Sequence, residues 1–454
     1  MSLRNFRFAA VLFVIAACLP VAAHASETIE ELAHRAVSGD TPTAHAAIES
    51  LRKMGYEGLD ALLSQNRDLI EARLAGKADP EEWNRAAYAI DSVARQKDAW
   101  ASGLFWHTDL DSAKAEAART GRPIVSLRLL GNLDEELSCA NSRFFRSILY
   151  TDNRVKEAMR ENFVLHWRSE RPAPVMTVDF GDGRKLVTTV TGNSIHYFLS
   201  PEGRIIDALP GLYSPEFFAE YLGNFPRLVR QRNEAFRPAT LDNQDPLRAP
   251  DTRFEAHRNR VRNYLLAKWR SDLLELGVDG SKLPFVFRLD TEPRSSDKNP
   301  SAVEAAPRAI TKMVAESDLL QPTPIQQQQL LENTSNIHWK QLAERFGYKG
   351  ISDESLRFVR AKYDLLHTKS GETFRKMTEK LVESVSLDTV RNAYFFHTQI
   401  LKWLNEGADN DLEAFNARVY SEVFLTPASD PWLGLYRDDV FLAVERNGII
   451  ALER

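Results

Sequence analysis

The sequence predicts an α+β protein of several domains, in which a central mixed β-sheet lies between an N-terminal helical bundle and a mostly α-helical C-terminal domain. Apolar residues recur at helical spacing on both sides of residues 101–231, whereas β-rich and helical runs alternate within that range. A β-hairpin pattern and a helix close this middle part, an order that favours a mixed sheet covered by helices. A chain of 454 residues is long enough for two or three domains.

Residues 1–25 have the organisation of a cleaved secretory signal peptide. Arginines precede an apolar run over residues 8–19 that is too short to anchor the chain across a bilayer. Ala23-His24-Ala25 then supplies the small residues that a signal peptidase requires. We therefore expect a mature chain that begins at Ser26 and is periplasmic or secreted.

Cys18 leaves an alternative open, because residues 15–18 also fit a lipobox and would give an envelope protein that is lipid-anchored through Cys18. Cleavage after Ala25 leaves Cys139 as the one cysteine, so the mature chain cannot form an internal disulfide.

The chain has a formal charge of −5, and its charged residues form no long block of one sign. This distribution argues against a nucleic-acid-binding protein, which needs a basic face. No later apolar run has the length of a transmembrane helix.

Residues 26–100 are predicted to form a helical domain of antiparallel helices joined by short loops. Residues 47–63 resemble one HEAT-type helical hairpin, although a single hairpin does not establish a repeat array. Helices are expected from about Ile29, at 44–54, at 58–65 and at 81–95.

Residues 101–231 are predicted to form the mixed sheet and its covering helices. Helices are expected at 111–120, 140–149, 153–162 and 215–222, and strands at 123–130, 163–167, 195–199 and 204–208. The glycines around Asp182 are read as a turn in a polar insert. Residues 232–252 contain three prolines and are predicted to be a linker.

Residues 253–454 are predicted to form an α-helical domain. Its helices are expected at 253–276, 302–319, 324–346, 353–367, 371–384 and 387–406, followed by a turn-rich aromatic segment at 430–436. The arginines of the first helix indicate either a solvated basic face on a core-packed helix or a helix that lies on an anionic surface.

Several short motifs in the middle part occur in an order and at a spacing that are informative together. They are Ala113-Lys114 with Gly121–Val125, Ser138–Ser142, Phe144-Phe145, Val155, Asn162–Val164, Gly192–Ile195 and Ser200–Gly203. Between Trp106 and Asp207, roughly a quarter of the chain, the sequence therefore resembles the thioredoxin-like superfamily. Within it, the sequence is most similar to the thioredoxin-like domain of the spermatogenesis-associated protein 20 type.

Two departures from this family pattern bear on function. The C-x-x-C motif is here Cys139-Ala140-Asn141-Ser142, so the second thiol is replaced by an alcohol, and Ser194 stands where the family has a cis-proline. A cis bond before a residue other than proline costs about 3 kcal/mol, so we expect a trans peptide there. A self-contained dithiol oxidoreductase is excluded, because there is no second cysteine.

The candidate site consists of Cys139 and Ser142, supported by Arg143 and Ser194, which the resemblance places near Cys139. A thiol at the start of a helix is favoured as a thiolate, and Ser142 could donate a hydrogen bond to it. One hypothesis is thus monothiol redox or thiol-binding activity toward small thiols or cysteine-containing envelope proteins. The other is a non-catalytic envelope scaffold in which Cys139 is a small core residue. An accessible sulfur favours the first hypothesis and a covered sulfur the second.

No cofactor or metal is expected, because the ten histidines contain no H-E-x-x-H and no close pair with a carboxylate at ligand spacing. His166 and His196 are predicted on two strands that lie near each other. They are expected either to make separate local hydrogen bonds or to share a ligand or a proton.

Overall fold

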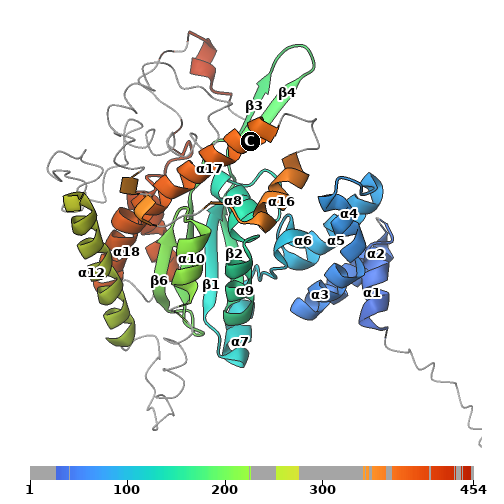
Figure 1. Ribbon diagram of the computed structural model, residues 1–454, viewed down its shortest axis with the longest axis horizontal. Helices are drawn as coiled ribbons and strands as arrows, with labels where there is room; N and C mark the ends of the chain where they lie inside the picture. The colour runs from blue at the N-terminus through green and yellow to red at the C-terminus, as the bar shows by residue number, and fades with distance from the viewer. Residues whose placement is uncertain are drawn as a thin grey trace, which may run out of the picture.

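The computed structural model describes residues 27–39, 41–223, 225, 252–275, 341–342, 344–346, 350–363, 371–407, 411–433, 435, 441 and 443–450. The predicted signal peptide, its lipobox alternative, nearly all of the linker at 232–252, the helix at 302–319 and most of the helix at 324–346 lie outside these residues. The described part is an α+β structure with a four-stranded mixed sheet between two groups of helices (Figure 1).

The N-terminal helices are α1 (Ile29–Ala36), α2 (Pro42–Lys53), α3 (Tyr56–Gln65), α4 (Arg67–Leu74), α5 (Pro80–Ala94) and α6 (Ala99–Ser102). The predicted helices are present, whereas α4 and α6 were not predicted. Thr28 and Glu31 form a capping box on α1, and Asp79 caps α5 directly before Pro80. Gly58 lets α3 approach α2 closely, because a Cβ atom there would lie 2.0 Å from the Leu51 carbonyl oxygen.

The main sheet has the strand order β2-β1-β5-β6. The strands are β1 (Ile124–Leu130), β2 (Val164–Arg171), β5 (Ser194–Leu199) and β6 (Ile205–Pro210). β1 pairs with β2 in parallel and with β5 antiparallel, and β5 and β6 form an antiparallel hairpin. The four strands that were predicted are therefore confirmed, with shifts at their ends.

Five helical segments accompany the sheet: α7 (Leu110–Thr120), α8 (Ala140–Phe144), η1 (Phe145–Leu149), α9 (Asn153–Asn162) and α10 (Pro215–Leu222). Each agrees with a predicted helix, and η1 continues α8 as a π-helical turn. His196 and Phe198 of β5 contact Tyr150, Phe218 and Tyr221, whereas Tyr197 contacts Phe415 from the C-terminal part. Helices thus cover both faces of the sheet.

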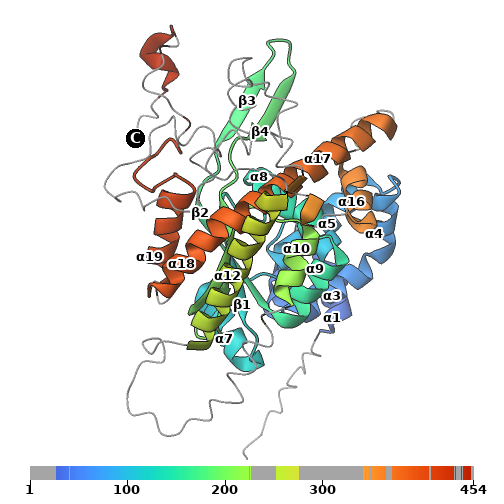
Figure 2. The same ribbon diagram turned by 60° about the vertical axis from the view of Figure 1, so that its left-hand side comes forward.

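A second, two-stranded sheet was missed by the sequence prediction. β3 (Val175–Asp179) and β4 (Lys185–Thr189) pair antiparallel across the turn around Asp182. This hairpin projects from the body of the protein in both views (Figures 1 and 2). Only its base, at Thr188 and Thr189, is buried.

The described C-terminal elements are α12 (Thr252–Glu275), α16 (Asp353–Tyr363), α17 (Gly371–Arg391), η6 (Asn392–His397), α18 (Thr398–Asn405), α19 (Leu412–Arg418), η7 (Val419–Val423) and η8 (Glu445–Gly448). The predicted break between 384 and 387 is wrong, because α17 is continuous there and Val385 is buried. α19 and η7 were not predicted. Among the described residues, no helix has both the length and the apolar character needed to cross a membrane.

In the part of the chain that the structure describes, most buried hydrophobic residues belong to two clusters. One joins the main sheet to the C-terminal helices and extends from Leu104 to Leu433. The other belongs to the N-terminal helices and includes Leu59, Ile90 and Phe105. Of the described C-terminal helices, α12, α17, η6, α18, α19 and η7 therefore share a core with the sheet (Figure 2).

Candidate functional site

Cys139 is the N-cap residue of α8, as the sequence predicted for a helix start. Two backbone hydrogen bonds fix this turn: the Cys139 amide donates to the Leu130 carbonyl at 3.2 Å, and the Ala140 amide donates to the Thr191 carbonyl at 3.0 Å. The residue is 0% exposed, and its Sγ lies 4.0 Å from the Asn193 carbonyl oxygen. The sulfur is therefore covered in the folded protein.

The loop before β5 lies against this turn, which confirms the expected proximity of Cys139 and Ser194. Asn141 Nδ2 donates to Ser194 Oγ at 2.8 Å. Gly192 permits the approach, because a Cβ atom at this position would lie 2.7 Å from Asn141 Oδ1. As expected, the described residues contain no cis peptide bond.

Ser142 is buried one turn after Cys139, but its hydroxyl serves another partner than the one expected. Ser142 Oγ donates to Ser138 Oγ at 2.9 Å. Since a serine hydroxyl has a single proton, that proton is not directed at the Cys139 sulfur. The structure therefore pairs the Ser142 hydroxyl with the side chain of Ser138.

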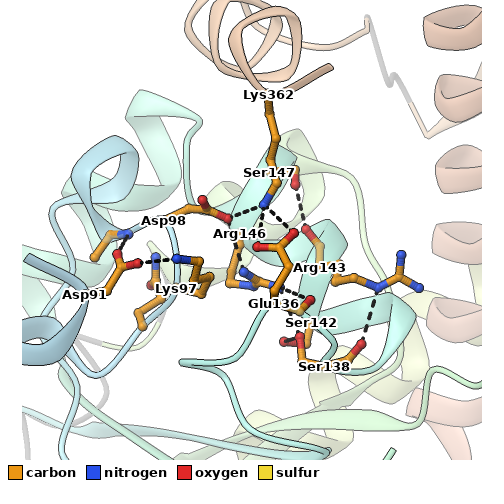
Figure 3. A network of polar contacts seen from close by, with 12 residues as sticks. Asp91, Lys97, Asp98, Glu136, Ser138, Ser142, Arg143, Arg146, Ser147 and Lys362 are labelled. Atoms are coloured by element: carbon orange, nitrogen blue, oxygen red, sulfur yellow. Dashed lines mark hydrogen bonds and ion pairs between the residues drawn. The ribbon is translucent and has the colours of Figure 1, made fainter. Parts of the chain in front are cut away.

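The arginines after Cys139 hold the turn in place through other groups. Arg143 donates to the Ser138 carbonyl at 3.3 Å and to Thr189 Oγ1 at 3.0 Å, at the base of the β3–β4 hairpin. Arg146 is buried, and its guanidinium contacts Asp98 Oδ2 at 3.1 Å and Ser138 Oγ at 3.1 Å (Figure 3). Both guanidinium groups thus tie the turn to neighbouring elements.

The acidic run before Cys139 is engaged as well. Asp134 lies 3.8 Å from Arg95, and Glu135 accepts a hydrogen bond from Asn132. Glu136 lies 2.9 Å from Lys362 of α16, and Lys362 also contacts Asp98 at 2.6 Å. A chain of charges therefore connects the N-terminal helices, the Cys139 turn and α16 (Figure 3).

Aromatic side chains complete the surroundings of the sulfur. Burial raises the pKa of both Tyr150 and Tyr420 well above its usual value, and the nearby Cys139 contributes in the same direction. Tyr420 belongs to η7, and its hydroxyl donates to the Asn193 carbonyl at 3.5 Å. Water is excluded from this environment, so a charged sulfur there would lack solvation.

His166 and His196 lie on strands separated by β1, and the structure gives them separate partners. His166 Nδ1 is 2.8 Å from Ser126 Oγ, and His196 Nε2 is 2.7 Å from the Tyr150 hydroxyl. Burial lowers the pKa of each imidazole to about 3, so both are neutral near pH 7. The two histidines therefore make separate local hydrogen bonds, which was the first of the two expectations.

A buried polar cluster around Asp207 was missed by the sequence analysis. Its carboxylate accepts hydrogen bonds from the Ala208 amide at 2.6 Å, His397 Nε2 at 2.9 Å, His257 Nε2 at 3.3 Å and the Tyr221 hydroxyl. Burial alone would raise the pKa of Asp207, but His397 and His257 lower it below the usual range. The four donors belong to β6, η6, α12 and α10, so no local sequence motif predicts this cluster.

Arg258, next to His257 on α12, corrects the expectation of a solvated basic face. It is 2% exposed and donates to the carbonyl oxygens of Ile206 at 2.8 Å and Leu404 at 3.1 Å. Arg260 and Arg270 of the same helix are exposed. The basic residues of α12 are thus divided between the interior and the surface.

The described residues contain no group of three or more histidine, cysteine or carboxylate side chains arranged to hold a metal ion. Comparison of the chain with protein-family models, with curated proteins and with solved structures gave no match.

Proposed function

We propose that this chain is an exported, non-catalytic scaffold protein built on a thioredoxin-like unit. In this proposal, the turn that would carry thiol chemistry serves as the point where the N-terminal helices, the sheet and α16 are joined. Export follows from the predicted signal peptide at residues 1–25.

The thioredoxin-like part of the proposal is supported by topology. A βαβ unit with parallel β1 and β2 is followed by the antiparallel pair β5–β6 and by α10, the order that the resemblance implies. The Cys139 turn lies beside the Ser194 loop, as the aligned motifs require. The β3–β4 hairpin is an insertion between β2 and β5.

The observation that carries the scaffold proposal is the burial of Cys139. Its sulfur is inaccessible, and the Ser142 proton goes to Ser138. Arg146 is ion-paired to Asp98. A reactive thiol needs access and a positive environment that is not consumed by other partners. In this protein, Ser142 and Arg146 instead contact Ser138 and Asp98, and these contacts hold the turn in place.

Alkylation of the folded protein tests this proposal. We expect Cys139 to react with iodoacetamide at least about 100-fold more slowly in the folded chain than in the urea-unfolded chain, because exchange through rare opening limits access. Rates would be followed by mass spectrometry between pH 6 and 9. Cys139→Ser gives the background rate.

A matched control places an accessible thiol two residues away. Leu137 is 39% exposed, so Leu137→Cys in a Cys139→Ser background should react readily when folded. Fast alkylation of Cys139 in the folded wild type, with a midpoint near about pH 7, would contradict the scaffold proposal. It would instead support the second candidate, monothiol redox or thiol binding, which is favoured by the position of Cys139 at the start of α8.

A further inference from the structure

The β3–β4 hairpin is an arm whose base is fixed to the body of the protein. Thr189 Oγ1 donates to the Ser138 carbonyl at 2.8 Å and accepts from Arg143 at 3.0 Å. Beyond this base the arm projects (Figures 1 and 2), and every residue of β3 is exposed or half-buried. A two-stranded sheet needs a further strand or a packed face to be stable in water, so the arm is suited to receiving a partner.

The hydrogen bonds of the hairpin show which backbone groups of β3 point outward. Two bonds mark the paired positions at its ends: Phe180 amide to Arg184 carbonyl at 3.1 Å, and Val190 amide to Pro174 carbonyl at 3.3 Å. Bonded and non-bonded pairs alternate along an antiparallel ladder. The residues whose amide and carbonyl groups point away from β4 are therefore Val175, Thr177 and Asp179.

The outer edge of β3 is open to an added strand. These three residues are exposed, Val175 to 53%, and no strand among the described residues pairs with this edge. Residues 175–179 contain no register shift, proline or lysine, which are common devices against edge pairing. The edge of β4, by contrast, begins with Lys185, and its Thr189 carbonyl already accepts from Arg143 at 3.5 Å.

We propose that β3 pairs antiparallel with β3 of a second copy of this chain, about a twofold axis at Thr177. Two hairpins would then form one four-stranded sheet. In this register all of residues 175–179 are paired, and each facing pair with outward backbone groups exchanges two main-chain hydrogen bonds. The proposal concerns assembly, and it depends neither on the scaffold function nor on whether Cys139 reacts.

The charges of the hairpin are compatible with a second copy in this register. Asp179 has its own counter-ion, because Lys185 Nζ lies 3.1 Å from its carboxylate. Across the dimer, Asp179 faces the uncharged Val175 of the partner subunit, so the two Asp179 residues lie at opposite ends of the paired segment. A register centred on Asp179 would instead set like charges against each other, which is unfavourable.

The apolar residues of the hairpin are complementary in the same register. Met176, Val178 and Leu186 are half-buried and lie on one face, since Val178 pairs with Leu186 and alternate residues of a strand share a face. Pairing through β3 places Val178 beside the partner's Met176, and Met176 beside the partner's Val178. The two apolar strips thus join into one across the dimer, and removing their surface from water favours association.

Sedimentation of the purified full chain tests the proposal. We expect the wild type to change from monomer to dimer between about 1 μM and about 1 mM. Thr177→Pro removes an outward amide proton but none of the bonds between β3 and β4, so dimerisation should weaken at least about 10-fold. Val187→Pro is the matched control: Val187 faces Thr177 across the hairpin, and the same change on the β4 edge should leave dimerisation unchanged.

A charge exchange at the twofold axis tests the register. Thr177→Lys and Thr177→Glu should each be monomeric, because like charges would face each other, and an equimolar mixture of the two should dimerise again. Circular dichroism of each variant checks that it folds.

Three outcomes would overturn the proposal. A wild type that stays monomeric up to about 1 mM would leave the β3 edge for an extended segment of a different protein. Equal weakening by Thr177→Pro and Val187→Pro would show that the β3 edge is not the specific contact. A mixture of Thr177→Lys and Thr177→Glu that stays monomeric would exclude the twofold register at Thr177.

Discussion

The carboxylate of Asp207 allows the contribution of a buried charge to the free energy of unfolding to be measured directly in this protein. It is 0% exposed and accepts hydrogen bonds from two histidines, a tyrosine and a backbone amide. Removing one partner of such a group leaves the others buried without their acceptor, which costs several kcal/mol.

We expect Asp207→Asn to lower the free energy of unfolding by about 3 kcal/mol at pH 7. Because the pKa of Asp207 is lowered in the folded state, its contribution is present above the unfolded pKa of about 4 and is lost as the pH falls below it. The difference between wild type and variant should therefore shrink from pH 7 to pH 3. Urea unfolding at the two pH values measures this.

Asp179→Asn, in the exposed β3–β4 hairpin, serves as the control and should change stability by less than about 0.5 kcal/mol at pH 7. An Asp207→Asn penalty that is the same at pH 3 and pH 7 would show that packing, and not the buried charge, sets the cost.

Individual site residues could be predicted from the sequence only where a motif fixed their place. The helix start at Cys139 was expected from the sequence pattern, and its proximity to Ser194 was expected from the family resemblance that the order of short motifs carries. The partner of Ser142 and the Asp207 cluster could not be foreseen in the same way. They depend on which side chains meet after folding, such as His397 and Asp207, which are 190 positions apart.

Gly58 illustrates how the contact between two helices can reverse a helix preference. Alanine normally stabilises a helix by about 1 kcal/mol relative to glycine. At Gly58, however, the new Cβ would meet the backbone of α2 at Leu51, which cannot yield as a flexible side chain can. We expect Gly58→Ala to destabilise the protein by about 2 kcal/mol, as overpacking does, measured by thermal unfolding.

Gly371→Ala is the matched control, because a Cβ at that helical position would meet nothing within 4 Å. It should be neutral or slightly stabilising. Equal effects of the two substitutions would mean that α3 can shift away from α2 at little cost.

Secondary structure was predictable where capping residues and periodicity agreed. α9 begins directly after its N-cap Asp152, and α7 ends directly before its C-cap Gly121; both residues are strong local signals. The β3–β4 hairpin was missed because its strands are mostly solvent-exposed on both faces and lack a clear apolar alternation. The predicted break in α17 failed because burial of Val385 and Thr389 against the core outweighs weak local helix propensity.

The two separate hydrophobic clusters imply that the N-terminal helices can lose structure without the sheet. Leu59 is fully buried in the smaller cluster, so Leu59→Ala should cost about 3 kcal/mol. We expect hydrogen exchange to show that α1–α5 lose protection while β1 and β5 keep theirs. Leu127→Ala, the same change in the larger cluster, should lower protection in the sheet and in α18 together.

If Leu59→Ala lowered protection equally in both clusters, the described chain would behave as one cooperative unit.

The overall α+β architecture, with helices on both sides of a central sheet, was predicted from the alternation of patterns along the chain. The sequence did not predict that most of the described C-terminal helices share the core of the sheet. Sequence periodicity indicates that a helix has an apolar face, but it does not indicate which surface that face covers.

Arg128 on β1 also has a consequence for how the chain acquires its structure. It is buried in the middle of the sheet, and its Nη2 donates to Glu413 Oε1 at 2.7 Å, across 285 positions of sequence. The two residues can meet only after a very long loop has closed, and contacts between such distant parts of a chain form slowly. A chain that stops before α19 would keep the Arg128 guanidinium inside the sheet without its Glu413 partner. The charge of a residue in an early strand is thus neutralised in part by a residue that is made much later.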